Sequence, residues 1–172
     1  MLTKEKIIEL FTALNEKLKA EETKGEVAIV GGAVMCLVFD ARSATKDVDA
    51  IFKPSSKIRE LAAQVGDELG VPQDWLNDGA KGFMSKDYVH QEVMVLSHLT
   101  VTAPQAEYML AMKCISARLD TKDKDDCEFL IRRLGLASVQ AVLSIVEKYY
   151  PRNQVPTKTT FFVEELIEKI PE

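Results

Sequence analysis

The chain has 172 residues, of which 47% are hydrophobic and 28% are charged, with both signs of charge mixed along its length. This length and composition fit one compact domain, or one core with a small appendage, and they exclude an intrinsically disordered chain. The formal net charge of −5 excludes a protein that binds nucleic acid through its overall charge, although a local basic patch is still compatible with it.

The cysteines and the N-terminus indicate the class of protein. Cys36, Cys114 and Cys127 are odd in number, far apart and in no CxxC pair, which argues against a disulfide framework and against a structural zinc site. We expect each to lie in or near the core as a small apolar residue. The first residues, MLTKEKIIELF, are charged and amphipathic, and no segment reaches the length of a membrane span. We therefore expect a cytoplasmic protein with no membrane partner.

The first part of the chain predicts alternating helices and strands. Thr3 can cap a helix in which apolar residues recur at helical spacing. Residues 27–30 form a β-branched run before Gly31 and Gly32, and they predict a short buried strand. The apolar stretch after the glycines predicts a buried helix, the polar residues 40–46 a loop, residues 47–52 a second strand, and residues 57–70 a helix that stops at Gly70.

The second part is mixed at first and then helical. Residues 71–85 are rich in turn formers and include the only tryptophan, Trp75. Residues 88–104 predict one or two strands that end at Pro104. Four helices are expected after it, over residues 105–119, 122–136, 138–151 and 158–170.

This order of elements predicts the α+β class, with a small mixed β-sheet flanked by helices and a C-terminal helical portion. We expect a core of residues 1–103, including the N-terminal helix. Residues 104–172 would form a helical portion packed on that core.

The stretch TKDVDAIF carries two carboxylates in an apolar strand. Asp47 and Asp49 are two residues apart, so in a strand they point to the same face, where they would repel each other and lose hydration. Hard oxygen ligands of this kind suit Mg²⁺, and two such ions about 3.5–4 Å apart would stabilise a displacement at phosphorus. A salt bridge from Arg42 or Lys46 is the alternative explanation for the pair.

The two glycines upstream add a second feature. Without a Cβ, the backbone at Gly31 and Gly32 can approach a ligand closely, and the N–H groups of the helix that follows favour phosphate. A tight strand-to-helix turn is the simpler interpretation of the glycines alone. Their spacing along the sequence from the paired carboxylates favours a phosphate site.

These residues support a family resemblance. The stretch GGAVMCLVFDARSATKDVDAIF resembles the signature of the nucleotidyltransferase (polymerase β-like) superfamily, a Gly-Gly or Gly-Ser turn, a short helix and Asp-x-Asp on a strand. Arg42 and Thr45 make it similar to a bacterial branch of abortive-infection and toxin–antitoxin nucleotidyltransferases and their uncharacterised relatives. A downstream block resembles the same branch through Pro104, Lys113, Arg118, Lys122, Asp123 and Asp126. DWLND, residues 74–78, is similar to the uncharacterised relatives.

The resemblance implies roles for particular residues. It implies metal ligands at Asp47 and Asp49, which with Glu92 would also be the catalytic residues. It implies nucleotide-binding residues at Gly31, Gly32, Arg42, Thr45, Lys113 and Arg118. It further implies two Mg²⁺ ions, an NTP as donor, a hydroxyl acceptor on tRNA, a protein or a small molecule, and a possible toxin–antitoxin partner protein.

The chain departs from the family pattern at two positions. Active members place a third carboxylate on an adjacent strand; here Glu92 is the best candidate and Asp87 the next. Position 33 is Ala, where many members have Ser or Thr. Two functions therefore stay open, a Mg²⁺-dependent nucleotidyltransferase and a catalytically inactive module of the same fold that binds nucleotide or a partner. For the second block, the alternatives are that Lys113 lies on a solvated helix face and that Asp123 and Asp126 have a structural role.

Overall fold

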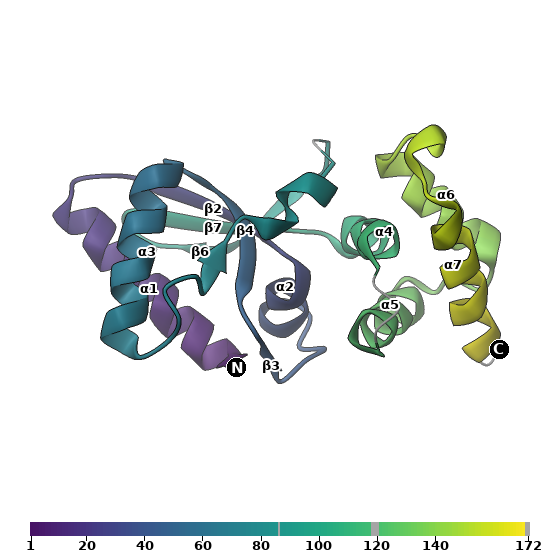
Figure 1. Ribbon diagram of the computed structural model, residues 1–172, viewed down its shortest axis with the longest axis horizontal. Helices are drawn as coiled ribbons and strands as arrows, with labels where there is room; N and C mark the ends of the chain where they lie inside the picture. The colour runs from purple at the N-terminus through teal and green to yellow at the C-terminus, as the bar shows by residue number, and fades with distance from the viewer. Residues whose placement is uncertain (86, 118–120, 171–172) are drawn as a thin grey trace. The chain divides into compact units, whose positions relative to one another are not determined.

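The computed structural model describes residues 1–85, 87–117 and 121–170. The chain divides into two compact units (Figure 1). The sheet unit consists of Met1–Gly82 and His90–Pro104, and the helical unit of Phe83–Val89 and Gln105–Glu172. The chain therefore passes from one unit to the other three times.

The elements follow one another in two groups. Those of the sheet unit are β1 (Leu2–Thr3), α1 (Lys4–Ala20), β2 (Gly25–Val30), α2 (Gly31–Leu37), β3 (Ala44–Thr45), β4 (Val48–Lys53), α3 (Ser55–Leu69), β5 (Leu76–Asn77), the 3₁₀ helix η1 (Gly79–Phe83), which ends at the unit boundary, β6 (His90–Val95) and β7 (Leu99–Pro104). Those of the helical unit are α4 (Ala106–Ser116), α5 (Thr121–Leu134), α6 (Val139–Tyr149), the 3₁₀ helix η2 (Arg152–Gln154) and α7 (Thr157–Lys169).

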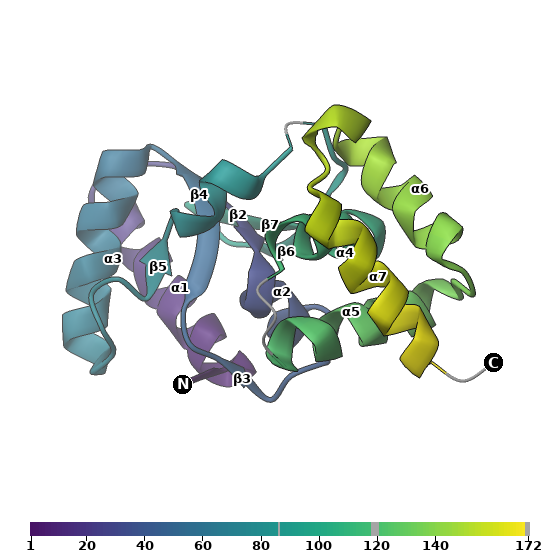
Figure 2. The ribbon, with the colours of Figure 1, turned by 45° about the vertical axis from the view of Figure 1, so that its right-hand side comes forward.

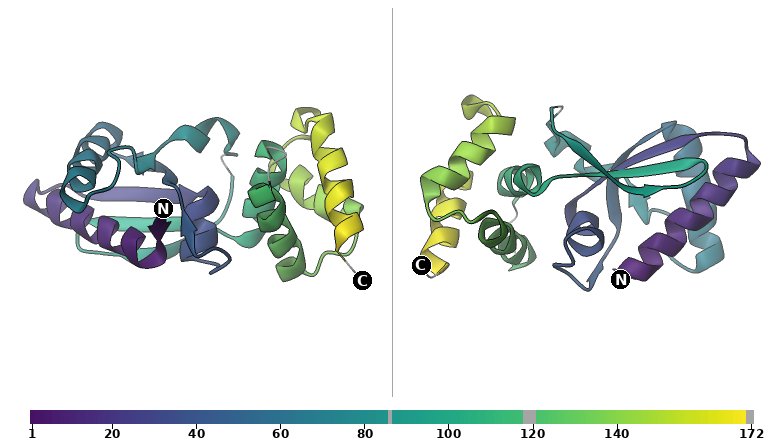
Figure 3. Two further views of the ribbon diagram at one scale, coloured as in Figure 1. Left: turned by 60° about the horizontal axis from the view of Figure 1, so that its bottom comes forward. Right: turned by 180° about the vertical axis from the view of Figure 1, so that it is seen from behind.

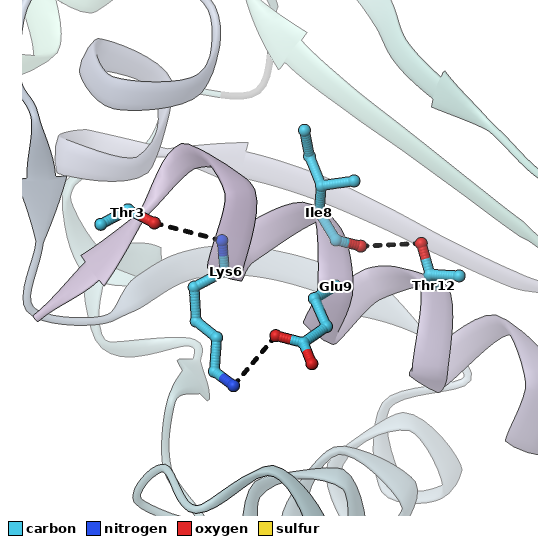
Figure 4. A network of polar contacts seen from close by, with 5 residues as sticks. All are labelled: Thr3, Lys6, Ile8, Glu9 and Thr12. Carbon is cyan, nitrogen blue, oxygen red and sulfur yellow. Dashed lines mark hydrogen bonds and ion pairs between the residues drawn. The ribbon is translucent and has the colours of Figure 1, made fainter.

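The first helix begins where the sequence predicts it. Thr3 is extended, and its hydroxyl accepts a hydrogen bond from the backbone N–H of Lys6 at 3.3 Å, which satisfies one free donor of the first turn (Figure 4). On the next turn, Lys6 forms an ion pair with Glu9 at 3.0 Å. The Thr12 hydroxyl donates to the carbonyl of Ile8 at 2.8 Å. These local bonds support the start of α1.

The main sheet is mixed, in the order β5-β4-β2-β7-β6. β2 pairs antiparallel with β4 and parallel with β7, and short β5 adds a parallel edge beside β4 (Figure 2). β6 and β7 form an antiparallel hairpin, seen from behind in Figure 3. A mixed sheet with helices before, between and after its strands confirms the predicted α+β class.

One face of the sheet is the core of this unit. A Cβ atom on Gly25 would lie 2.8 Å from Leu18 of α1 and 3.2 Å from Ile58 of α3, so both helices cover the face to which Gly25 belongs. The strand residues on the same face as Gly25 are buried: Val27, Ile29, Ala50, Phe52, Leu99, Val101 and Ala103. The opposite face carries Asp49 and is only partly covered.

Two local predictions need correction. The helix after the glycines is shorter than its apolar run suggests, since α2 begins at Gly31 and ends at Leu37. The strand predicted from residue 88 onward is not regular, because in β6 Glu92 pairs with Thr102 while Met94 pairs with Val101. Val93 is therefore the extra residue of a β-bulge, which shifts the faces of the residues that follow it.

The helical unit is built around α4. Every residue from Tyr108 to Ile115 is buried, as expected of a helix that is apolar on nearly all sides. α4 packs against α5, α6 and α7, and the Thr159 hydroxyl of α7 donates to the Cys114 carbonyl at 3.2 Å. The structure thus confirms the helices predicted after Pro104, which form one compact group around α4.

A group of tyrosines holds the segment Phe83–Val89 in the helical unit. The Tyr108 hydroxyl accepts from the Ser85 N–H at 2.8 Å, and the Tyr150 hydroxyl donates to the Phe83 carbonyl at 2.6 Å. Tyr88 stacks on Tyr108 with ring centroids 4.0 Å apart. Burial raises the pKa of Tyr88 to about 12 and raises that of Tyr150 further.

The predictions about the cysteines and about membrane spans can be compared with the structure. Cys36, Cys114 and Cys127 are all free and buried, as predicted. Burial raises the pKa of the Cys36 thiol, which disfavours a reactive thiolate there. Among the described residues no single helix is long and apolar enough to cross a membrane, although the bent pair Lys122–Leu134 and Val139–Tyr149 together reaches that length and composition.

Candidate functional site

The turn between β2 and α2 brings the backbone against a carboxylate. Gly31 follows the last residue of β2 and has a φ of +66°, a conformation that residues with a side chain rarely adopt. Val30 pairs with Asp49 of β4, so the strand register puts Asp49 next to this turn. A Cβ atom on Gly31 would lie 3.2 Å from Oδ2 of Asp49. Glycine therefore leaves one oxygen of the carboxylate directly beside the backbone.

Gly32 faces the loop that leads to β4. A Cβ atom on Gly32 would lie 2.5 Å from the hydroxyl oxygen of Thr45 and 3.4 Å from Nη1 of Arg42. Thr45 is buried, and its strand β3 is held in place by pairing with β1, with Leu2 opposite Thr45. Four of the predicted nucleotide-binding residues, Gly31, Gly32, Arg42 and Thr45, thus lie together in the structure.

Asp47 lies at the entrance to β4. It occupies a bend directly before Val48, the first residue of the strand, and it is half-buried like Asp49. The backbone N–H of Val48 donates to the carbonyl of Trp75 at 2.6 Å, which holds the start of β4 against the segment before β5. Asp47 therefore belongs to the loop before β4, whereas Asp49 is placed by the sheet.

A third segment approaches Asp49, and the sequence patterns did not assign it to the site. In the parallel pairing of β4 with β5, Asn77 is the register partner of Asp49. A Cβ atom on Gly79 would lie 3.0 Å from Oδ1 of Asn77 and 3.7 Å from Oδ1 of Asp49. The carboxylate of Asp49 is therefore flanked by Gly31 on the side of Oδ2 and by Gly79 on the side of Oδ1.

Trp75 anchors this third segment. Its ring is buried, packs edge-on against Phe11 with centroids 5.6 Å apart, and donates its indole N–H to the Ala62 carbonyl at 2.8 Å. The buried indole therefore anchors an irregular, turn-rich segment in the core. Two residues later the chain presents Asn77, so the buried indole determines where that side chain lies.

Glu92, the best candidate for a third carboxylate, does not join this group. Glu92 is exposed on β6, and the sheet order places β2 and β7 between β6 and β4. Three strand spacings amount to about 14 Å, which is beyond the reach of a direct contact with Asp49. Asp87 is an exposed residue of the helical unit. Among the described residues, no three His, Cys, Asp or Glu side chains gather where they could hold a metal ion.

With this geometry established, the chain was compared with known proteins. The model of one protein family, "Nucleotidyltransferase of unknown function (DUF6036)", matches residues 5–155. The chain belongs to this family. The superfamily predicted from the glycines and the paired aspartates is thereby confirmed. Searches of curated proteins and of solved structures gave no match.

In this DUF6036 nucleotidyltransferase, the second predicted block lies in the helical unit except for Pro104, which ends β7. The Lys113 ammonium lies 2.6 Å from Oδ2 of Asp126 and 3.4 Å from Oδ1 of Asp123, both on α5. Lys113 and Asp126 are only 7% and 2% exposed, so their charges compensate each other away from solvent. Lys113 does not lie on a solvated helix face. Arg118 lies outside the described residues, and the predicted phosphate contacts of Lys113 and Arg118 stay predictions.

The donor set around Asp49 is compatible with a hard cation. Asp47 and Asp49 offer half-buried carboxylate oxygens, which are a ligand type that Mg²⁺ accepts. The two aspartates would hold Mg²⁺ with the help of oxygens from water and from a bound phosphate.

Proposed function

We propose that this DUF6036 protein binds a nucleoside triphosphate together with Mg²⁺ at the edge formed by Gly31, Gly32, Asp47 and Asp49. We further propose that it transfers the nucleoside monophosphate to an acceptor hydroxyl. The observation that carries the proposal is the placement of the Asp49 carboxylate 3.2 Å from the position of a Cβ on Gly31. A phosphate that lies against the glycine turn is then also beside a ligand for its counter-cation.

The residues around the turn support distinct tasks. Gly31 and Gly32 leave the backbone open to phosphate oxygens. The Arg42 guanidinium, which lies beside Gly32, provides positive charge and donors that suit phosphate geometry. The Thr45 hydroxyl is fixed by the small β1–β3 sheet and can donate to the same ligand.

The proposed reaction is a displacement at the α-phosphorus. The acceptor oxygen forms a bond to this phosphorus, the bond to the oxygen that bridges to the β-phosphate breaks, pyrophosphate leaves, and the hydroxyl proton passes to water. Mg²⁺, when bound, supplies positive charge opposite the phosphate oxygens. The protein contributes by positioning the nucleotide and by electrostatic stabilisation, which dominate phosphoryl-transfer catalysis.

A second candidate function is a nucleotide-binding module that transfers nothing and acts through a partner protein, such as the other member of a toxin–antitoxin pair. One observation favours it, namely that no third carboxylate joins Asp47 and Asp49 among the described residues. Both candidates require the same nucleotide site and differ in whether an acceptor becomes labelled.

Calorimetry tests the binding step that both candidates share. We expect wild-type protein to bind at least one of ATP, GTP, CTP and UTP in the presence of Mg²⁺. The double variant Asp47→Asn, Asp49→Asn should lose Mg²⁺-dependent binding while keeping its circular dichroism spectrum. The matched control Glu60→Gln, Asp74→Asn removes two exposed carboxylates of the same unit and should bind like wild type. Absence of heat for every nucleotide with the wild type would refute the proposed site.

Incubation with labelled nucleotides and cell extract then separates the two candidates. Transfer predicts a label, from an α-³²P nucleotide, on a tRNA, a protein or a small molecule, and the class of labelled product identifies the acceptor. The Asp47→Asn, Asp49→Asn variant should leave every fraction unlabelled. Binding by calorimetry without any labelled product would support the non-catalytic module.

A further inference from the structure

Within the edge that surrounds Asp49, Asn77 has no role in the proposed function so far. β4 has two neighbours, and opposite Asp49 they place Val30 of β2 and Asn77 of β5. Asn77 is therefore the polar side chain that the sheet itself sets beside the central carboxylate. It is half-buried, so it is partly accessible to solvent.

Local bonds fix the orientation of the Asn77 carboxamide. Its Oδ1 accepts a hydrogen bond from the backbone N–H of Gly79 at 2.9 Å. The residue between them, Asp78, forms an ion pair with Arg59 of α3 at 3.0 Å, which ties the turn to the unit. In the described part of the chain the Nδ2 amino group of Asn77 donates no hydrogen bond. The carboxamide is thus held by its oxygen, and its two N–H donors are available.

We infer that Asn77 is a positioning residue of the nucleotide site and donates an N–H to a phosphate oxygen of the nucleotide bound at Asp49 and Gly31; this inference rests on the proposed function. The nearby Gly79 supports it, because a side chain there would occupy the space between Oδ1 of Asn77 and Oδ1 of Asp49. The glycines at positions 31 and 79 let the backbone pass close to both oxygens of Asp49, and Asn77 lies beside the second glycine. A neutral amide at this position recognises phosphate without adding a third negative charge.

Two substitutions separate this role from a purely local one. Asn77→Ala removes both the donor and the turn acceptor. Asn77→Asp keeps an oxygen that can accept from the Gly79 N–H, but it removes the donor and places a third carboxylate beside Asp49. If Asn77 only supported the turn and faced no bound nucleotide or Mg²⁺, Asn77→Asp would bind both like wild type. Asp78→Asn is the matched control, since it changes the adjacent side chain and its ion pair with Arg59.

The test uses the full chain and whichever of ATP, GTP, CTP and UTP binds the wild type. At saturating Mg²⁺, Asn77→Ala should weaken nucleotide binding about tenfold, the loss expected for a hydrogen bond to a charged oxygen at a half-exposed site. In Mg²⁺ titrations at fixed nucleotide, Asn77→Asp should reach half-maximal binding at a lower Mg²⁺ concentration than wild type. Asp78→Asn should match wild type in both measurements.

The outcomes distinguish this inference from the proposed function. Nucleotide binding by Asn77→Ala within twofold of wild type, or an unchanged Mg²⁺ midpoint for Asn77→Asp, overturns the inference and leaves the proposed function standing. Failure of the wild type to bind any nucleotide overturns both. A thermal denaturation curve for each variant shows whether it is folded, and Asn77→Asp provides the decisive readout if Asn77→Ala is not.

Discussion

At the scale of single residues, glycines decide how close the backbone comes to Asp49. Gly31 combines a left-handed conformation with a contact to the carboxylate, whereas Gly70, with a φ of +68°, has the same conformation with no atom within 4 Å of its Cβ position. The two residues carry the same backbone requirement in different surroundings. Comparing them separates conformational strain from the contact with Asp49.

Gly31→Ala should therefore lose both stability and binding. A left-handed non-glycine residue costs about 1–2 kcal/mol, and Gly70→Ala should lose the same amount from the free energy of unfolding. Only Gly31→Ala, whose Cβ would lie 3.2 Å from Asp49, should also lose Mg²⁺-dependent nucleotide binding. Urea denaturation and calorimetry on both variants provide the check. Equal nucleotide affinity for the two variants would show that the close approach at Gly31 serves only the fold.

At the scale of elements, periodicity predicted most of the fold. The buried runs of α1, β2, β4 and α3 are long enough to show their repeat in the sequence, and the helices after Pro104 show it as well. β5 has two residues and no repeat, so its pairing with β4 could not be predicted. The position of Asn77 follows from that pairing and from the anchoring of Trp75. The distance of Glu92 from Asp49 likewise depends on sheet order, and the bulge at Val93 depends on how β6 pairs with β7. Both are non-local properties.

The contact between α4 and α5 depends on a buried ion pair. Lys113→Met would deprive Asp126, 2% exposed, of the ammonium at 2.6 Å and should cost about 3–5 kcal/mol of the free energy of unfolding. The double variant Lys113→Met, Asp126→Leu should recover most of this loss, because two apolar side chains need no charge compensation. Lys124→Met, which breaks a more exposed pair with Glu165, should cost less than about 1 kcal/mol.

Urea denaturation measures the three variants, and a double variant as unstable as Lys113→Met would contradict the explanation. The same double variant tests the phosphate role predicted for Lys113. If it folds and still binds nucleotide with the affinity of wild type, the lysine holds the helices together and does not contact phosphate.

At the scale of the whole molecule, the tyrosines make stability sensitive to alkaline pH. The pKa of Tyr88 is raised to about 12 from its ordinary value near 10, so the unfolded chain loses this proton first. The contribution of Tyr88 is complete below pH 10 and decreases as the pH rises from about 10 to about 12. Tyr88→Phe should therefore lose less stability than wild type over this interval, while the two show parallel pH dependence between pH 8 and 9. Urea denaturation across this range measures the free energy of unfolding at each pH. If this free energy decreases equally steeply for both proteins above pH 10, the role assigned to Tyr88 is wrong.

The three passages of the chain between its units limit how the protein can be divided or recombined. A cut after Pro104 separates Phe83–Val89 from Tyr108 and Tyr150, whose hydroxyls hold its backbone. The first fragment then keeps the whole sheet unit, whereas the second fragment lacks part of the helical unit. A chimaera that exchanges the helical unit with a relative would have to exchange Phe83–Val89 along with the helices. A boundary placed at Pro104 therefore divides the helical unit, even though it leaves the sheet unit whole.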